Sequence, residues 1–427
     1  MPRRYSPEDG TVDHVAPEVP LAAAQLGVML AAFPRNAVLE LPLPGSAVGR
    51  EWLEAAGLED AEVSGDHVRF DRHGTSWTVE DVGSRNGTWL MGHRLPIGQP
   101  AALDAGAVLR MGRTLLVHRP ELALPHAPAL PKGELVAPFG LRDFASSLRA
   151  LTRHPPSNVL IVGETGTGKE LAARVVADAL GRSQPFAPVN VAGVSAGVFE
   201  SQLFGHVAGA FSGAREASEG VVMAHRGGTV LLDEIGELPQ ELQPKLLRLL
   251  ENREVLPVGA TRPVQADVLI VAATNQDLER RVAEGSFRRD LLARLELASL
   301  RLPPLRGRCE DIPAIALAVA GKVGANLELG AVEVEAMERL LLEPWPTNVR
   351  GLLAALGRIA AIDGDPGLRL WAVNQALGER QKQLQGPLTM AAVTQALERA
   401  GGNQSEAARL LGISRGKLRR FLDKQGP

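Results

Sequence analysis

Short apolar runs separated by turn signals make up the first quarter of the chain. The separators include Pro34-Arg35-Asn36, Pro44-Gly45, Ser64-Gly65-Asp66 and Asn86-Gly87. Short strands at regular spacing with such turns between them are typical of a small all-β domain. We therefore expect an all-β domain over residues 24–118, and we interpret the proline-containing residues 1–22 as a loose leader.

Longer apolar runs alternate with helical patterns from about residue 138 to 308. The clearest runs are 159–162, 230–232 and 268–271, which are almost entirely Val, Leu and Ile. Continuous runs of this kind are typical of a parallel sheet that helices cover on both faces. We expect an α/β domain at 138–308, an all-helical segment at 309–377, and a stiff proline-rich linker at 119–137.

The C-terminal part predicts helix, glycine-containing turn and helix over residues 387–427, after a polar linker at 378–386. Ser414 is suited to cap the second helix, on which Leu418, Phe421 and Leu422 share one face. From Pro387 onward there are seven basic and three acidic residues, a net charge of +4 against −3 for the whole chain. This excess favours contact with DNA phosphates. The residues expected to face DNA are Ser414, Arg415, Lys417, Arg419 and Arg420. A basic helical tail without DNA specificity is the alternative.

Composition limits the remaining possibilities. The chain has 427 residues, with 46 Lys and Arg against 49 Asp and Glu, and its single cysteine is Cys309. One cysteine excludes an internal disulfide framework and a cysteine-clustered zinc site. No segment approaches the ~20 apolar residues that span a bilayer. We expect a cytoplasmic protein with no membrane partner.

A glycine-rich loop lies between the apolar run 159–162 and the helical stretch 171–180. Glycines let backbone N–H groups converge on phosphates, the helix N-terminus adds positive potential, and a lysine reaches the β- and γ-oxygens. The sequence therefore predicts an ATP-binding loop. Its residues are Gly163, Glu164, Thr165, Gly166, Thr167, Gly168, Lys169 and Glu170, where Glu170 replaces the usual Ser or Thr. A glycine-rich turn without a ligand is the alternative.

Two carboxylates follow the apolar run 230–232. Asp233 can orient water on Mg²⁺, and Glu234 can polarise the attacking water of a phosphoryl transfer. Asp-Glu pairs are also common on protein surfaces. After a buried strand, in the same domain as a phosphate loop, we interpret Asp233 as a metal-binding residue and Glu234 as a catalytic one.

Six further motifs lie between residues 200 and 350. They are Glu200-Ser-Gln-Leu-Phe-Gly-His206, Gly209-Ala-Phe-Ser-Gly-Ala214, Ala272-Ala-Thr-Asn275, Phe287-Arg-Arg-Asp-Leu-Leu-Ala-Arg294, Leu302-Pro-Pro-Leu-Arg-Gly-Arg308 and Trp345-Pro-Thr-Asn-Val-Arg350. Together with the phosphate loop, which has the same Glu after Lys, they resemble the sigma-54-dependent transcriptional activators, or enhancer-binding proteins, of the AAA+ class. The resemblance covers residues 138–370. It implies an α/β AAA+ P-loop ATPase with a helical lid.

The resemblance also implies roles for single residues. Asn190 matches the residue that holds the catalytic Glu in check, and Asn275 the sensor of the γ-phosphate. Arg288 and Arg294 match fingers that the neighbouring subunit supplies in trans, and Arg350 matches a lid arginine acting in cis. A guanidinium fork neutralises the charge of the γ-phosphoryl transition state. The family assembles into rings, so a hexamer, with a dimer when inactive, is implied.

The resemblance implies a binding partner for the loop at residues 209–214, which has a glycine near each end. In the family, the loop matching Gly209, Ala210, Phe211, Ser212, Gly213 and Ala214 touches sigma-54 and transmits hydrolysis to the polymerase. Ser212 replaces the usual Thr and loses a methyl group, worth up to ~0.8 kcal/mol when buried. Thr347 and Gly351 also depart from the family pattern, near Arg350.

The two ends of the chain resemble known modules as well. Gly49-Arg50, Ser64-Gly-Asp-His67, Gly83-Ser-Arg-Asn-Gly-Thr88, Asp104-Ala-Gly106 and Met111-Gly112 resemble a forkhead-associated (FHA) β-sandwich, whose end loops bind phosphothreonine. The implied phosphopeptide-binding residues are Arg50, Ser64, Arg85 and Asn86, with His67 bracing the loops. Gly65 replaces a frequent basic residue, and an FHA fold that binds its own ATPase domain, or nothing, is the alternative. Residues 387–427 resemble a Fis-type helix-turn-helix.

Together these features predict a three-module activator. It would bind double-stranded DNA upstream of promoters, hydrolyse ATP with Mg²⁺ and remodel sigma-54 RNA polymerase holoenzyme. The FHA module would sense a phosphothreonine-containing protein downstream of a kinase. Two alternatives stay open: a DNA-binding AAA+ regulator that does not act through sigma-54, and a phosphopeptide-binding scaffold with an inactive ATPase.

Overall fold

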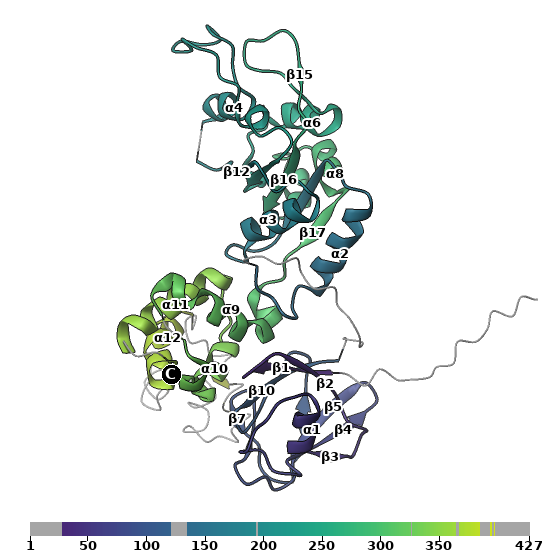
Figure 1. Cartoon of the computed structure of the whole chain (residues 1–427), viewed down its shortest axis with the longest axis vertical. Helices are drawn as coiled ribbons and strands as arrows, with labels where there is room; N and C mark the ends of the chain where they lie inside the picture. Colours follow the sequence, from purple (N-terminus) through teal and green to yellow (C-terminus); the bar gives the residue numbers. More distant parts are fainter. Residues whose placement is uncertain are drawn as a thin grey trace, which may run out of the picture.

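The computed structural model describes residues 28–120, 135–193, 195–325, 327–363 and 367–384, together with 393, 394 and 397. The predicted leader at 1–22, most of the linker 119–137 and nearly all of the module 387–427 lie outside the described residues. So do Ser414, Arg415, Lys417, Arg419 and Arg420. Figure 1 shows three folded parts: a β-sandwich domain, an α/β domain, and a helical lid that lies beside the sandwich.

Two antiparallel sheets form the sandwich domain, as the run-and-turn pattern predicts. Their strand orders are β2-β1-β10-β9-β6-β7 and β3-β4-β5-β8. Met29, Phe70, Trp77 and Leu116 belong to the buried core between them. The elements are β1 (Val28–Phe33), β2 (Ala37–Glu40), β3 (Ala47–Val48), α1 (Arg50–Ala55), β4 (Val68–His73), β5 (Ser76–Asp81), β6 (Thr88–Leu90), β7 (His93–Arg94), β8 (Ala101–Leu103), β9 (Val108–Met111) and β10 (Thr114–Arg119).

The α/β domain is built on a parallel sheet of five strands in the order β12-β13-β16-β11-β17. The three apolar runs become its central strands, which confirms the predicted sheet. The strands are β11 (Asn158–Val162), β12 (Phe186–Asn190), β13 (Thr229–Asp233), β16 (Leu269–Thr274) and β17 (Ser299–Arg301), with a separate hairpin of β14 (Glu254–Val255) and β15 (Val264–Gln265).

Helices cover both faces of this sheet. One face packs on α2 and α3, through Phe144, Leu148 and Val176. The other packs on α4, α6 and α8, through Leu203, Leu246 and Leu291. The helices are α2 (Arg142–Arg153), α3 (Lys169–Ala179), α4 (Ala196–Phe204), α5 (Val221–Ala224), η1 (Ile235–Glu237), α6 (Gln243–Asn252), α7 (Leu278–Ala283) and α8 (Arg289–Glu296).

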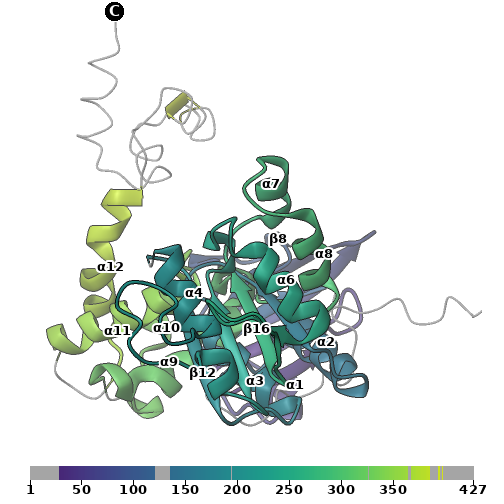
Figure 2. The same cartoon turned by 90° about the horizontal axis from the view of Figure 1, so that it is seen from above.

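The lid is all helical and lies to one side of the α/β domain when seen from above (Figure 2). Its elements are η2 (Leu305–Asp311), α9 (Ile312–Val319), η3 (Ala320–Val323), η4 (Leu329–Ala331), α10 (Val334–Leu341), α11 (Asn348–Asp363) and α12 (Leu370–Leu384). Helix α12 continues through most of the segment 378–386 that we interpreted as a linker. The run Glu379-Arg380-Gln381-Lys382-Gln383 consists of good helix formers, which explains this correction.

Among the residues that the structure describes, no helix is both long and apolar enough to cross a membrane.

Candidate functional site

The glycine-rich loop connects β11 to α3 at the carboxyl edge of the parallel sheet. Gly166 and Gly168 adopt φ of 78° and 100°, a left-handed backbone that glycine alone takes up readily. A side chain at Gly166 would also collide with the carbonyl oxygen of Thr347, which lies 2.3 Å from the position of its Cβ. The loop therefore takes a phosphate-binding shape at the N-terminus of a helix, and it presses against the lid.

Lys169 is the first residue of α3, and its ammonium group lies inside the loop. Its Nζ donates to the carbonyl oxygens of Gly163 at 3.0 Å and Glu164 at 3.3 Å. Burial lowers the pKa of Lys169, and the nearby carboxylates of Asp233 and Glu234 oppose that shift. The lysine and the two carboxylates, 64 residues apart in sequence, thus share one electrostatic environment.

The carboxylate pair lies at the end of β13, next to the loop. Asp233 is half-buried, and its Oδ1 accepts from the backbone N–H of Glu234 at 3.0 Å. Glu234 adopts a φ of 59°, which is uncommon for a residue with a side chain and occurs often at functional sites. One carboxylate oxygen of Asp233 remains for a cation. Mg²⁺ binds through one or two carboxylates and the phosphates of its substrate, so this residue fits it.

Asn190 ends the neighbouring strand β12 and lies opposite Asp233 in register. Its side-chain oxygen accepts from the backbone N–H of Ala192 at 2.8 Å. Within the described part of the chain, Asn190 makes no hydrogen bond to Glu234. The structure therefore brings Asn190 to the site and shows it bonded to its own loop.

The predicted sensor and lid arginine both reach the phosphate loop. Asn275 follows β16, and its Nδ2 donates to the hydroxyl of Thr165 at 2.8 Å. Arg350 lies in α11, with its Cβ 3.0 Å from the position that a Cβ of Gly166 would occupy. Its positive charge contributes to the lowered pKa of Lys169. Lid and loop thus form two walls of one site.

Arg288 and Arg294 lie elsewhere. Both belong to the α8 region, on the sheet face opposite to α3. Arg288 is exposed and pairs with Asp290, its Nη2 lying 2.7 Å from Oδ2. The Nη2 of Arg294 donates to the carbonyl oxygen of Leu250 at 3.0 Å. Neither arginine meets the phosphate loop of its own chain.

Three residues of the site were not singled out from the sequence. Arg306 forms a fork with Glu164, with Nη1 2.8 Å from Oε2 and Nη2 2.5 Å from Oε1. This partner lowers the pKa of Glu164 to about 2. Arg308 is buried beneath the loop, and its Nη2 donates to the carbonyl oxygen of Thr167 at 3.1 Å. Both arginines lie within the motif 302–308, which marked the family without revealing their partners.

Asn348 is the third, and it is fully buried between loop and lid. Its Nδ2 donates to the carbonyl oxygen of Thr165 at 3.0 Å and to Oε2 of Glu164 at 3.2 Å. Its Oδ1 accepts from the backbone N–H of Leu305 at 2.7 Å. A φ of 53° places it in the left-handed region that asparagine tolerates best among residues with side chains.

Asn348→Gly tests this tether. Glycine tolerates the same backbone, so the variant removes only the side-chain bonds and leaves the buried N–H of Leu305 without its partner. We expect a loss of about 1–3 kcal/mol in the free energy of unfolding, measured by thermal or denaturant unfolding. Arg253→Gly is the matched control, because Arg253 also has a positive φ, of 56°, away from the loop. Equal stabilities of the two variants would contradict the role of Asn348.

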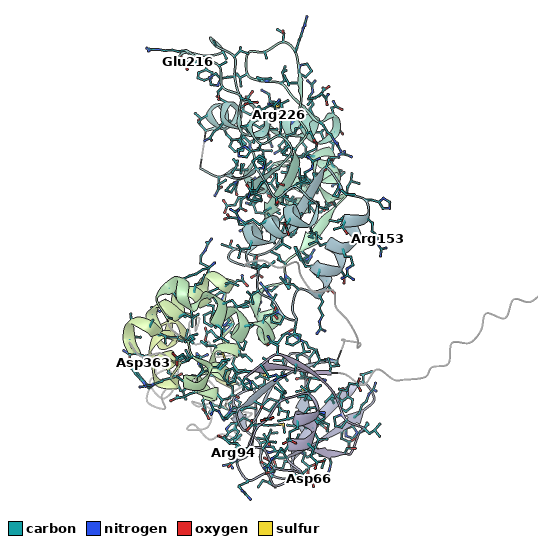
Figure 3. The ribbon with its side chains drawn as sticks, viewed as in Figure 1. Asp66, Arg94, Arg153, Glu216, Arg226 and Asp363 are labelled. Atoms are coloured by element: carbon teal, nitrogen blue, oxygen red, sulfur yellow. The ribbon has the colours of Figure 1, made fainter. Side chains whose placement is uncertain are left out.

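The loop with Phe211 projects beyond α4. Gly209 and Ala214 close it, the N–H of Gly209 donating to the carbonyl oxygen of Ala214 at 2.7 Å. Phe211 is 47% exposed, and its ring lies 5.0 Å from that of His206. Ser212 is exposed as well. Glu216 of the same loop region lies at one extremity of the molecule in Figure 3. An aromatic ring is thus displayed on a short, closed loop.

The four residues expected to bind a phosphopeptide gather in neighbouring loops of the sandwich domain. Arg50 begins α1, and its Nε donates to the carbonyl oxygen of Val63 at 3.2 Å. The hydroxyl of Ser64 accepts from the backbone N–H of Arg85 at 3.1 Å. The Nδ2 of Asn86 donates to the carbonyl oxygen of Glu62 at 2.7 Å. Asp66 in Figure 3 marks these loops at the opposite extremity from Glu216.

His67 braces these loops from below, as the sequence predicts. Its Nδ1 accepts from the N–H of Ser64 at 3.0 Å, so Nε2 carries the proton and donates to the carbonyl oxygen of Gly87 at 3.1 Å. Burial lowers the pKa of His67, which keeps this neutral form. A second proton would sit on Nδ1 and point at the N–H of Ser64, which would break that hydrogen bond. His67 therefore holds the loops only when its ring is neutral.

Family models match three parts of the chain. Residues 141–301 match the "Sigma-54 interaction domain", residues 47–112 match the "FHA domain", and residues 390–424 match "Bacterial regulatory protein, Fis family". The first lies on the α/β domain and the second on the sandwich domain. The third lies almost wholly outside the described residues.

Curated relatives and a solved structure are similar to this chain over about two thirds of its length. The transcriptional regulatory protein GlrR of Escherichia coli K12 is 37% identical over 276 residues, which are 62% of each chain. ZraR of Klebsiella oxytoca is 38% identical over 66% of this chain and 68% of its own. The crystal structure of NtrX from Brucella abortus in complex with ATP aligns with a TM-score of 0.51 and 28% identity, over 68% of this chain and 69% of that one. This chain spans less than two thirds of the length of GlrR.

Proposed function

Because this chain belongs to the family of sigma-54-dependent transcriptional regulators, we propose that it activates transcription by hydrolysing ATP and remodelling the sigma-54 RNA polymerase holoenzyme. The resemblances drawn from the motifs are confirmed for the FHA domain, the AAA+ domain and the Fis-type domain. One observation carries the proposal. The phosphate loop, the Asp233–Glu234 pair, Asn275 and Arg350 meet at one edge of the parallel sheet.

Each residue at this edge of the sheet would have its own role in ATP hydrolysis. The loop amides and the N-terminus of α3 would hold the phosphates. Lys169 would exchange its two carbonyl partners for the β- and γ-oxygens. Asp233 would hold Mg²⁺, which supplies charge neutralisation when bound. Glu234 would orient and polarise the attacking water, while Asn275, bonded to Thr165, would sense the γ-phosphate.

A second subunit would complete the site. Arg288 and Arg294 lie on the face of the domain opposite to α3, away from the loop of their own chain. In a head-to-tail ring, such a face meets the nucleotide site of the neighbour. We therefore place these arginines as fingers in trans and expect a ring, a hexamer, with a dimer as its inactive form. Hydrolysis would then depend on assembly.

The loop that carries Phe211 and the Fis-type domain would bind the transcription machinery and DNA, respectively. Phe211 and Ser212 would contact sigma-54, since the ring is displayed where a large partner can reach it. The Fis-type domain would bind double-stranded DNA upstream of promoters, through Ser414, Arg415, Lys417, Arg419 and Arg420. These partners place the protein in the cytoplasm.

The FHA domain would bind a phosphothreonine-containing protein and so connect the activator to kinase signalling. Arg50 is exposed beside Ser64, and a guanidinium with a hydroxyl suits a phosphate group. Arg85 and Asn86 extend the same surface toward the peptide backbone. The acidic residues Glu54, Glu59 and Asp60 line the pocket beside Arg50, so a basic residue next to the phosphothreonine is favoured.

Arg50→Ala is expected to weaken phosphothreonine-peptide binding by about ten- to a hundredfold, because hydrogen bonds to charged groups contribute about 1.5–3 kcal/mol. Calorimetry with a phosphothreonine peptide pool measures this, with the unphosphorylated pool as blank. Arg72→Ala is the control, since Arg72 lies near the other end of β4 and bonds to Gly74. No heat from the wild type with any phosphorylated pool would remove the sensor role.

Lys169→Ala tests the ATPase itself. The variant is expected to lose nucleotide binding and steady-state ATP hydrolysis, since residues 163–170 include no other lysine or arginine to replace the ammonium group. A fluorescent ATP analogue reports binding, and phosphate release reports turnover. Near wild-type ATPase activity in this variant would rule out the assigned site.

A further inference from the structure

The outer face of the larger FHA sheet is covered by the lid and, at Val28 and Leu30, by Phe139. Strand β1 reads Val-Met-Leu-Ala-Ala-Phe and is buried along its whole length. Antiparallel sheets with one face in water alternate apolar and polar residues, so an uninterrupted run signals a sheet covered on both faces. Ala32, Phe33, Leu115 and Val117 belong to one buried cluster with Ile312, Met337 and Leu340 of the lid. Figure 1 shows β1 and β10 next to α9 and α10.

Ion pairs fix the orientation of this contact. The Nε of Arg110 lies 2.8 Å from Oε2 of Glu338 and its Nη1 lies 2.9 Å from Oε1 of Glu335. The guanidinium also lies over the ring of Trp89, 3.7 Å from its centre. Nearby, the Nη2 of Arg119 lies 2.5 Å from Oε2 of Glu310 and donates to the carbonyl oxygen of Gly307 at 3.0 Å. The pairs Arg110–Glu338 and Arg119–Glu310 are largely buried, and buried pairs restrict two surfaces to one orientation.

The second ion pair ends on η2, and η2 also holds the phosphate loop. Residues of η2 bond to three different parts of the protein: the phosphate loop, the FHA domain and the residues before α2. Arg306 and Arg308 bond to Glu164 and Thr167 of the loop. Gly307 and Glu310 bond to Arg119 of the FHA domain. Asp311 accepts from the backbone N–H groups of Phe139 and Gly140, which precede α2.

We propose that Arg119 and Glu310 are positioning residues for the nucleotide site, with η2 as the element that connects the docked FHA domain to the phosphate loop. The inference rests on the proposed binding of ATP at that loop. Docking holds Gly307 and Glu310 in place, and this holds the intervening Arg306 and Arg308 against Glu164 and Thr167. A preorganised loop binds its ligand with a smaller ordering cost. Docking and nucleotide binding are therefore thermodynamically coupled.

The phosphopeptide loops stay accessible in this arrangement. Arg50 and Asn86 are exposed, and Asp66 points away from the lid in Figure 3. The docked surface and the phosphopeptide surface are separate faces of one domain. Docking can therefore act on the nucleotide site without covering the peptide site.

Cys309 provides a native reporter of docking. It is the only cysteine of the chain, it is 6% exposed, and it lies in η2, which packs on β1 and β10. Burial raises the pKa of its thiol to about 12. The Cys309 thiolate must attack the S–S bond of an aromatic disulfide reagent and release its aromatic thiolate, so labelling requires the contact to open. The rate of labelling therefore reports how often the buried cluster between η2 and the FHA domain opens.

Arg119→Gln in the full chain tests the coupling. We expect faster labelling of Cys309 by an aromatic disulfide reagent, and a five- to tenfold weaker affinity for a fluorescent ATP analogue, within the usual range of coupling between sites. Glu310→Gln should weaken the affinity equally, and the double variant should weaken it little further, because the two residues form one pair. Labelling is compared in Arg119→Gln, since Glu310 itself contacts the Cys309 thiol and raises its pKa. Arg69→Gln is the control, since Arg69 pairs with Glu80 on the other sheet.

The wild type tests the same coupling in reverse. Coupling is reciprocal, so saturating ATP analogue should lower the population in which Cys309 is accessible and slow its labelling. Unchanged labelling on nucleotide binding, or an unchanged affinity in a variant whose Cys309 labels faster, would overturn the inference. A wild-type labelling rate in Arg119→Gln would also overturn it, because the pair would then not hold the contact. Failure of the wild type to bind the analogue would instead reject the ATP site on which the inference rests.

Discussion

Glu234→Gln is expected to bind ATP as the wild type does and to lower the turnover number by at least about a hundredfold, the lower limit for losing a general base. Glu234 lies directly after β13, and its N–H bonds to Asp233, the residue placed at the cation. Glutamine keeps the shape of the side chain and removes the charge that polarises water. Phosphate release and equilibrium binding of a fluorescent ATP analogue measure the two quantities separately.

The control for this variant is Glu241→Gln. Glu241 is exposed and follows η1, so the substitution removes the same charge nearby without touching the phosphate loop. The account requires wild-type turnover in the control. Equal turnover in Glu234→Gln and the control would mean that another group activates the water, and the family assignment of Glu234 would not hold for this chain.

Phe211→Ala is expected to lower transcription activation by about thirtyfold or more, while ATPase activity stays within twofold of the wild type. Aromatic anchors at interface centres contribute at least ~2 kcal/mol, and their loss weakens binding accordingly. The Phe211 ring is nearly half exposed, so its removal costs the fold little. Transcription from a sigma-54 promoter in a purified system measures the first quantity, and phosphate release the second.

Two companion variants make this prediction specific. Val198→Ala is the control, because Val198 is an exposed apolar residue, at 59%, on the adjacent helix α4 and is truncated to the same residue. It should activate as the wild type does. Ser212→Thr restores the methyl group usual in the family, worth up to ~0.8 kcal/mol or about fourfold in affinity when buried at the interface. Loss of ATPase activity in Phe211→Ala would instead indicate a role for the loop in the ring.

Much of the nucleotide site could be predicted because its parts are local in sequence. The loop lies between a strand and a helix, and the carboxylates follow another strand, so the parallel sheet brings them to one edge. The tether by Asn348 is different. Its partners Glu164 and Thr165 are more than 180 residues away, and its left-handed backbone leaves no sequence pattern.

The docking of the FHA domain on the lid was also not predictable. The apolar run of β1 indicates that both faces of its sheet are covered, but it does not identify the covering element. Arg110 and Glu338 are 228 residues apart, and each is an ordinary charged residue in its own segment. The pattern of apolar and polar residues along a strand shows which of its faces are buried. Which element packs on a buried face depends on the shape and charge of both surfaces, and these exist only in the folded chain.

Co-migration of purified sigma-54 with this protein, trapped by ADP and aluminium fluoride on a native gel, tests the central claim most directly. We expect a trapped complex with the wild type that is lost in Phe211→Ala and retained in Val198→Ala. No complex with the wild type, while its ATPase activity is intact, would contradict the account and leave a DNA-binding ATPase that acts on another target.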